Sequence, residues 1–377
     1  MRRPGVIGHR AEHLSLTLHL GLPVVAPAHL FAQLGTMLGH ADLVAVGDFL
    51  VTPDRRAKTP ALALPHELDA AIRPGARGAT FTPDGRQAVI SLTNGGLAFI
   101  DLRNQKVRHV LDFSFLVGHD DALPQAVAVS PLGMIAAAFP ERHEIILIDR
   151  AKMRITERIK TSFPPRQIRF SAQGKFLFIG NSRETQTWPA IYAVQRKQYL
   201  LSRVEPMVAD TSRDDRYLYL YDPTKNSVRW LVSDTLETVR YFPLTAVSLS
   251  GRPLSIRVLR DHRIAIGYRG SLVITDRYIQ SAEMVHPAEE LDIALIEPSH
   301  DNRFIVFGSG GDLRILSTVN NLSQGLALPD GVKDVGTYPN GNYLLYLDPS
   351  KKSASIRRIQ IPSRHSSSDP AAIMVRN

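Results

Sequence analysis

A strand–turn–strand pattern recurs seven times between residue 79 and the C-terminus, and it constrains the fold more than any other feature. Its first copy runs over residues 79–92, where Pro83-Asp84-Gly85 forms a tight turn between two apolar stretches. Proline presets φ at a turn and glycine accepts a positive φ, while alternating apolar residues suit a half-buried strand. Successive copies lie about 43 residues apart, a period typical of β-propeller blades. The third turn residue marks each copy: Gly85, Gly133, Gly174, Asp215, His262, Asn302 and Gly341.

Each mark is followed by a strand predicted to be apolar on both faces. Such a strand is expected in the middle of a blade, because neighbouring blades cover both of its faces. Additional stretches such as 96–102 and 107–113 give four strands to a copy. The sequence therefore predicts a mainly β chain with a seven-bladed propeller over residues 79–377. The seven central strands are predicted at 87–92, 134–139, 176–180, 217–221, 264–268, 304–308 and 343–347.

This region resembles the WD-repeat propellers and the YVTN, or lactonase-like, propellers. The resemblance is carried by Phe81-Thr82-Pro83-Asp84-Gly85-Arg86, Val129-Ser130-Pro131 and Arg216-Tyr217-Leu218-Tyr219-Leu220. The regular Gly-His and Trp-Asp pairs of WD repeats are missing, and only two tryptophans occur, so the lactonase-like branch is favoured. The resemblance implies the fold, but propellers include scaffolds, hydrolases, oxidoreductases and lyases.

Residues 1–78 have a different pattern, with apolar residues at helical spacing in 27–38, 41–51 and 65–72. We expect a small helical segment here, separate from the propeller at 79–377. Its pieces 5–10, 21–28, 41–48 and 73–78 resemble, in order, the helical region that precedes the catalytic core of very-short-patch-repair-like endonucleases. That family's metal-binding carboxylates lie downstream, where this chain has the strand repeat, so no catalytic residue is carried over. A natural fusion, a relic and a chimera remain alternatives for this segment.

Composition excludes some classes of protein and leaves others open. The chain has no cysteine, which excludes disulfides, thiolate metal sites and cysteine nucleophiles. Its net charge of +9 permits binding to nucleic acid, but no Lys/Arg-rich run occurs, so nucleic acid is not the favoured partner. No apolar run approaches the roughly 20 residues that span a bilayer. We expect a cytoplasmic protein, with export through a signal-like stretch at 18–28 as the alternative.

The closure of the last blade has two possible solutions. Residues 371–375 could return as its outer strand, or an N-terminal stretch at 43–51 could complete it. We favour the C-terminal strand.

Propellers bind ligands at the ends of the central channel, so the lining of this channel is the predicted site. Five residues before each mark stand Thr80, Ala128, Arg169, Asp210, Arg257, Glu297 and Gly336. Of these, Arg169, Asp210, Arg257 and Glu297 could bind an anionic or polar ligand, since arginine presents a planar fork to carboxylate or phosphate. The alternative is that the four charges neutralise one another across a water-filled channel. Two carboxylates without histidine predict no metal site, and the sequence indicates no cofactor.

The leading hypothesis is a binding or interaction module that takes protein partners or a small polar or anionic ligand, without enzymatic activity. The alternative is a lactonase-like hydrolase with its site at the mouth of the channel, where Asp210 and Glu297 would be the acid–base candidates. A second alternative is association with DNA through residues 1–78.

Overall fold

The computed structural model describes residues 16–19, 22–25, 75–104, 106–113, 123–244, 251–276, 281–339, 341–348, 350–351 and 353–362. The chain forms two compact units, Met1–Ala63 and Leu64–Asn377. In the first unit, β1 (Leu16–His19) pairs antiparallel with β2 (Leu22–Val25), a hairpin that the sequence did not predict. The helices predicted at 27–38, 41–51 and 65–72 lie outside the described residues, so the helical segment and its endonuclease resemblance stay predictions.

The described part of the second unit contains seven antiparallel sheets, each built from consecutive strands. The first four sheets comprise β3 (Ala76–Phe81), β4 (Gln87–Leu92), β5 (Gly96–Asp101) and β6 (Lys106–Asp112); β7 (Ala126–Val129), β8 (Met134–Phe139), β9 (Glu144–Asp149) and β10 (Arg154–Lys160); β11 (Gln167–Phe170), β12 (Phe176–Gly180), β13 (Trp188–Ala193) and β14 (Gln198–Met207); β15 (Ala209–Thr211), β16 (Tyr217–Asp222), β17 (Ser227–Val232) and β18 (Thr238–Pro243). The last three comprise β19 (Ser255–Val258), β20 (Ile264–Thr275) and β21 (Ala282–Asp292); β22 (Leu295–Pro298), β23 (Phe304–Ser309), β24 (Asp312–Ser317) and β25 (Ser323–Ala327); β26 (Lys333–Thr337), β27 (Tyr343–Asp348) and β28 (Ser353–Arg358). All seven predicted central strands are present.

The fifth sheet has three strands, but β20 takes the place of two of the four strands of a blade. Fully extended, the 12 residues of β20 would span about 40 Å. Yet the amide of Ile264 donates a hydrogen bond to Oγ1 of Thr275 over 2.8 Å, so the two ends of β20 lie side by side. The strand therefore folds back on itself near Gly270, whose φ of 77° suits a sharp reversal.

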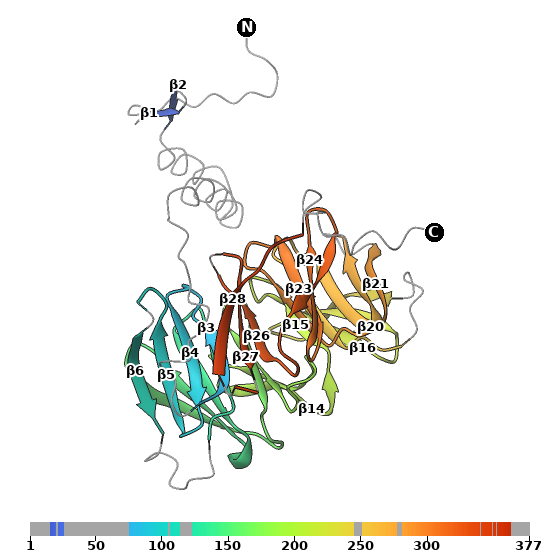
Figure 1. The fold of residues 1–377 in the computed structure, drawn as a ribbon. Coiled ribbons are helices and arrows are strands. Elements are labelled where there is room, and N and C mark those ends of the chain that lie inside the picture. The colour runs from blue at the N-terminus through green and yellow to red at the C-terminus, as the bar shows by residue number, and fades with distance from the viewer. Residues whose placement is uncertain are drawn as a thin grey trace. The chain divides into compact units, whose positions relative to one another are not determined.

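The seven sheets form a closed ring, because the last sheet packs against the first. Strands β26, β27 and β28 lie against β3, as the red and blue strands show in Figure 1. The hydroxyl of Tyr338 donates to the carbonyl of Gly85 at 3.0 Å, and its ring meets that of Phe81 edge-on with 5.2 Å between centroids. The fold is a seven-bladed β-propeller, as the repeat predicts.

The seventh blade has three strands within the described residues. Both stretches proposed to complete it, 371–375 and 43–51, lie outside those residues, so its fourth strand stays a prediction.

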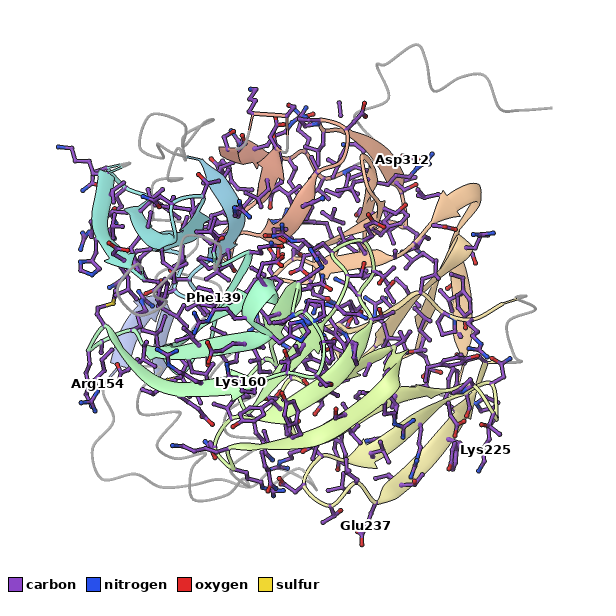
Figure 2. All side chains as sticks on the ribbon, turned by 90° about the horizontal axis from the view of Figure 1, so that it is seen from below. Phe139, Arg154, Lys160, Lys225, Glu237 and Asp312 are labelled. Atoms are coloured by element: carbon purple, nitrogen blue, oxygen red, sulfur yellow. The ribbon has the colours of Figure 1, made fainter. Side chains whose placement is uncertain are left out.

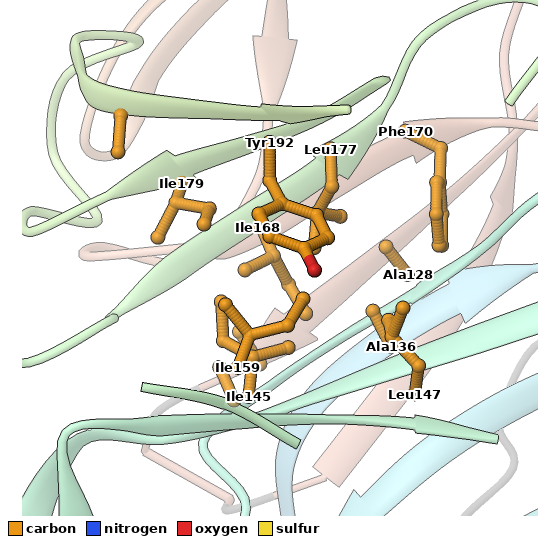
Figure 3. Packing of buried hydrophobic residues seen from close by; sticks show 13 residues of the cluster. Ala128, Ala136, Ile145, Leu147, Ile159, Ile168, Phe170, Leu177, Ile179 and Tyr192 are labelled. Carbon is orange, nitrogen blue, oxygen red and sulfur yellow. The ribbon is translucent and has the colours of Figure 1, made fainter. Parts of the chain in front are cut away.

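The core lies between the blades, which is why the central strands are apolar on both faces. Figure 3 shows one such interface, between the second and third blades, where side chains from β8 and β9 meet those from β11 and β12. Each fully buried Ile or Leu contributes about 2 kcal/mol. The labelled members are Ala128, Ala136, Ile145, Leu147, Ile159, Ile168, Phe170, Leu177, Ile179 and Tyr192.

The outermost strands β6, β10, β18 and β25 are largely exposed. Exposed residues alternate with more buried ones along β10, and most residues of β6 are exposed, as expected for an edge strand with one face in water. Arg154 and Glu237 point outward at the rim of the propeller (Figure 2). No helix of the described residues is long and apolar enough to cross a membrane.

A side-chain hydroxyl on the residue immediately before the three turn residues organises the repeated turn. Thr82, Ser171 and Ser212 each accept the amide hydrogen bond of the residue five positions later, at 2.9–3.0 Å. The third turn residue has a positive φ of 56° to 82° in six blades, which explains why glycine, aspartate, asparagine or histidine stands there. Neighbouring turns are also bonded, since Ser171 Oγ donates to Oδ2 of Asp215 over 2.5 Å.

Candidate functional site

The innermost strands β3, β7, β11, β15, β19, β22 and β26 surround a central cavity of about 720 Å³. All seven residues that stand five positions before the marks line this cavity. We call the end formed by the seven repeated turns the turn end, and the end at which the innermost strands begin the entry end. The cavity reaches both.

The four charged residues predicted for the channel lie next to one another on adjacent blades. Nη2 of Arg169 is 2.9 Å from Oδ1 of Asp210, and Nη2 of Arg257 is 3.2 Å from Oε2 of Glu297. Nε of Arg257 stands 4.0 Å from Oδ2 of Asp210, which also accepts the amide hydrogen bond of Val258 at 2.9 Å. Asp210 is thus held by one hydrogen bond from a backbone amide and by ion pairs with two arginines, which fix the position of its carboxylate.

Arg169 is supported by aromatic rings as well as by Asp210. Its guanidinium carbon lies 4.7 Å from the ring centre of Phe178 and 5.1 Å from that of Trp188. A guanidinium over an aromatic face gains a cation–π attraction that grows as the site is desolvated. This contact fixes the position of Arg169, whose side chain is one-fifth exposed.

Glu297 has a raised pKa. Burial is the main cause, the Arg169 guanidinium acts in the opposite direction, the Asp210 carboxylate adds to the increase, and together they raise the pKa from the ordinary value of 4.5 to about 8. The ion pair with Arg257 also favours the charged form. With a pKa of about 8, Glu297 can gain or lose a proton near neutral pH.

A second ring of residues, which the sequence reasoning missed, forms the mouth of the cavity at the turn end. The first residue of every repeated turn lines the cavity. We call these seven the mouth residues; each stands three positions after its counterpart in the first ring. Counting two positions back from each mark, instead of five, would have found them. The mouth residues are Pro83, Pro131, Ala172, Arg213, Arg260, His300 and Pro339.

The mouth is basic on one side and apolar on the other. Arg213, Arg260 and His300 come from the fourth, fifth and sixth blades, and the proline and alanine residues come from the remaining four. Burial lowers the pKa of Arg213, and the like charge of Arg260 lowers it further. Nη1 of Arg260 donates to the carbonyl of His300 at 3.3 Å, whereas the guanidinium of Arg213 has no hydrogen bond or ion pair with a described residue.

A loop of the third blade, residues 181–187 between β12 and β13, crosses the entry end. Nη2 of Arg183 lies 2.6 Å from the carbonyl oxygens of Arg77 and Gln125 and 2.7 Å from Oδ2 of Asp334. These three acceptors belong to the first, second and seventh blades. The loop thus spans the ring of strands at this end.

Gln186 anchors the same loop on the sixth blade. Its backbone amide donates to the carbonyl of Ala294 at 3.1 Å. Its side-chain amide donates to the carbonyl of Ile296 and accepts from the backbone amide of Ile296, both at 3.2 Å. Gln186 is 5% exposed, so these bonds are shielded from water. A backbone segment thus crosses the entry end from the third blade to the sixth.

The described part of the cavity wall offers no set of metal ligands. Among the described residues, no group of three or more histidine or acidic side chains is placed to hold a metal ion. The donors that dominate the site are guanidinium groups, which bind carboxylate or phosphate oxygens rather than cations.

The fold and its charged channel define the class of this protein as a seven-bladed β-propeller with an arginine-rich central cavity. The sequence matches no protein-family model and has no significant match among curated proteins. Among solved structures, it is similar to the β-propeller domain of Cps50 (Swd1) from Myceliophteria thermophila, with a TM-score of 0.57, 11% identity, and coverage of 76% of this chain and 97% of that one. It is also similar to hydrazine synthase of Kuenenia stuttgartiensis, with a TM-score of 0.56, 15% identity, and coverage of 77% and 97%. At these identities the likeness shows the fold alone.

Proposed function

We propose that this protein is a binding module whose turn end docks a partner protein that presents acidic side chains. The single observation behind the proposal is the mouth of the channel at the turn end, which carries Arg213 and Arg260 on adjacent blades, while the 181–187 loop crosses the other end. A positive recess at the centre of one face attracts and orients an acidic partner.

The charges around the mouth support the same face. In the repeated turns, Arg216 lies 3.5 Å from Asp214 and Arg303 lies 3.8 Å from Asp301, measured between the closest nitrogen and oxygen. These exposed pairs compensate their own charge locally, and such pairs add little to stability. They can exchange partners with an incoming protein, whereas the mouth supplies the net positive charge.

The proposal is tested by partner capture with the intact chain and matched variants. Arg216→Glu and Arg303→Glu reverse exposed charges at the turn end, and Arg154→Glu makes the same change on the outer strand β10. We expect a partner that is retained by the unaltered chain and by Arg154→Glu, and lost with the two turn-end variants. Equal retention by all three variants would overturn the choice of face.

A second candidate function is the lactonase-like hydrolase that the sequence resemblance suggests. The raised pKa of Glu297 favours it, because a carboxyl that titrates near neutral pH in a cavity suits general acid–base catalysis. Screening lactones with the unaltered chain and Glu297→Gln tests it: turnover lost in a folded Glu297→Gln variant supports the hydrolase, and no turnover by the unaltered chain argues against it. Asp210 is the less suitable base, since a backbone amide and two arginines already hold its carboxylate.

DNA association through residues 1–78 has no support from the described residues, which cover only 16–19, 22–25 and 75–78 of that segment. Retention of the full chain on duplex DNA, weakening steeply with salt, would be its signature.

A further inference from the structure

The ring of channel residues borders open space beside Glu297. In ring order, Glu297 on β22 is followed by Gly336 on β26, and both line the cavity. The two strands meet at this point, since Oγ1 of Thr337 donates to the carbonyl of Pro298 at 3.0 Å. A Cβ added at Gly336 would meet no atom within 4 Å, so this position faces the open part of the cavity. A small molecule can therefore reach the space next to Glu297.

Arg257, the neighbour of Glu297 on the other side, has fewer partners than its guanidinium can hold. Its Nη2 lies 3.2 Å from Oε2 of Glu297, while its Nε stands 4.0 Å from Oδ2 of Asp210, beyond hydrogen-bond distance. Nε and Nη1 are buried and have no hydrogen-bond partner among the described residues. A guanidinium offers five N–H donors, and a buried donor without a partner is costly. Arg257 thus depends on Glu297 for its closest ionic contact.

The charge of this row of residues changes when Glu297 binds a proton. With the two arginines, Arg169 and Arg257, and the two carboxyls, Asp210 and Glu297, all ionised, the row is neutral. The pKa of Glu297 is raised to about 8, chiefly by burial, so at pH 7 most molecules carry a proton on this carboxyl. The protonated row has one positive charge in excess, and Arg257 has then lost its closest counter-charge.

The other carboxyls around Glu297 keep their cations. Asp210 lies 2.9 Å from Arg169, and Asp334 lies 2.7 Å from Arg183. The residue that pairs with Glu297 on β23 is the apolar Val306. The titratable or charged residues on the elements around Glu297 are Arg257 on β19, Asp210 on β15, Arg169 on β11, Lys333 and Asp334 on β26, and His300 in the turn after β22. Of these, Arg257 is the cation whose counter-charge disappears when Glu297 is protonated.

We propose that the channel binds a small organic carboxylate together with one proton, with the proton on Glu297 and the carboxylate beside Arg257. The protonated Glu297 donates its O–H to the ligand, whose negative charge replaces the one that Arg257 has lost. The rest of the ligand occupies the space in front of Gly336. The row already pairs its arginines with carboxylates, which favours this anion over others. This inference goes beyond the proposed function, because it concerns the channel and needs no protein partner.

The test is calorimetric titration of the full chain with acetate, butyrate and benzoate, three carboxylates of increasing size, and with benzamide as the uncharged counterpart of benzoate. We expect saturable binding of at least one carboxylate at pH 7 and no measurable binding of benzamide. The affinity should fall roughly tenfold between pH 7 and pH 9, because the fraction of the protein with a protonated Glu297 falls by about that factor.

Proton uptake gives a second readout of the same site. Titrations in two buffers with different enthalpies of ionisation count the protons taken up with each ligand. We expect about one proton per carboxylate bound at pH 9, and few at pH 7, where Glu297 already carries its proton. A carboxylate that bound to a merely basic surface would take up no proton from Glu297.

Two glycine variants locate the ligand without changing any charge. Gly336→Leu fills the space beside Glu297 and should weaken the carboxylate by roughly tenfold or more. Gly325→Leu, on the outer strand β25, is the matched control, since a Cβ there also meets no atom within 4 Å. Neither glycine has a positive φ, so both variants should fold, and thermal unfolding verifies this.

Three further variants test the roles of the charged groups. Arg257→Gln removes the cation and should abolish saturable binding. Glu297→Gln replaces the titrating O–H with a permanent NH₂ donor, so its affinity for the carboxylate should be the same at pH 7 and pH 9. His300→Gln leaves the pair of Arg257 and Glu297 in place and should keep the roughly tenfold change with pH.

Four results would overturn the proposal: no saturable binding of any of the three carboxylates, binding of benzamide as tight as that of benzoate, a pH dependence that survives Glu297→Gln, or equal affinities of Gly336→Leu and Gly325→Leu. A failure here leaves the capture experiment with Arg216→Glu and Arg303→Glu unaffected, so the two proposals fail separately.

Discussion

Arg183 and Asp334 lie 151 residues apart in the sequence, and Nη2 of the arginine stands 2.7 Å from Oδ2 of the aspartate. The pair joins the third blade to the seventh across the entry end of the channel. Asp334 also accepts the amide hydrogen bond of Ala79 at 3.2 Å, so one carboxylate ties the first, third and seventh blades together.

Breaking this pair should destabilise the whole ring. Arg183→Ala leaves Asp334 with its charge mostly buried and uncompensated, for which we expect a loss of roughly 3 kcal/mol in the free energy of unfolding. Urea denaturation measures it, with the exposed neighbour Glu184→Gln as the control. The double variant Arg183→Ala/Asp334→Ala should lose less than the sum of the two single changes. Additive losses would show that the two residues do not act as a pair.

Glu297 should make stability depend on pH. Its pKa is 4.5 in the unfolded chain and about 8 in the folded one, so the folded state holds this proton more tightly. The resulting stabilisation is fully present below about pH 4.5 and is lost as the pH rises through about 8. Glu297→Gln cannot titrate and should lack this component, so the difference in unfolding free energy between the two proteins should change between about pH 5 and pH 9. Glu237→Gln, on the exposed rim, is the control, and a constant difference between Glu297→Gln and the unaltered chain would contradict the expectation.

Gly267 and Gly325 form a matched pair of strand glycines. A Cβ at Gly267 would lie 2.2 Å from the carbonyl oxygen of Ile293 and 2.4 Å from Oγ of Ser255, whereas a Cβ at Gly325 would meet nothing within 4 Å. Gly267→Ala should therefore destabilise by about 1–3 kcal/mol through overpacking. Gly325→Ala should be neutral or slightly stabilising. Thermal unfolding of both distinguishes them, and similar melting temperatures would contradict the close packing at Gly267.

Asp215 is a fully buried carboxylate that holds two turns together. It accepts hydrogen bonds from Oγ of Ser171 and Oγ1 of Thr211, and from the amides of Gln173 and Lys175. Asp215→Asn keeps a residue that tolerates the positive φ of 56° but places an NH₂ donor among these donors. We expect a loss of about 1–3 kcal/mol in unfolding free energy. Asp214→Asn, one position earlier and exposed, is the control, and an equal effect of the two changes would argue against the buried network.

Local sequence signals predicted most of the propeller. The turn residues and the apolar strands after them depend on interactions within a few residues, so Gln87–Leu92 and Phe176–Gly180 were placed correctly. Strand geometry is regular enough that counting back from each turn reached residues of the cavity wall. That Arg169, Asp210, Arg257 and Glu297 bind a ligand stays a prediction.

What the sequence did not reveal depends on contacts between distant residues. No local pattern indicates that Gln186 pairs with Ile296, 110 residues away, or that the loop 181–187 crosses the ring. The reversal within β20 was expected as two strands, but the hairpin at Leu16–Val25 was not expected at all. The division of the mouth into a basic and an apolar side follows from ring closure, since it appears only when residues of all seven turns are set around one axis.

The crossing of the entry end by residues 181–187 has a kinetic consequence. A loop across one end of a channel narrows the route through it, so we expect exchange with solvent to be faster at the turn end than at the entry end. A partner seated on the turn end would therefore slow the release of any small molecule already inside, without changing any contact which that molecule makes.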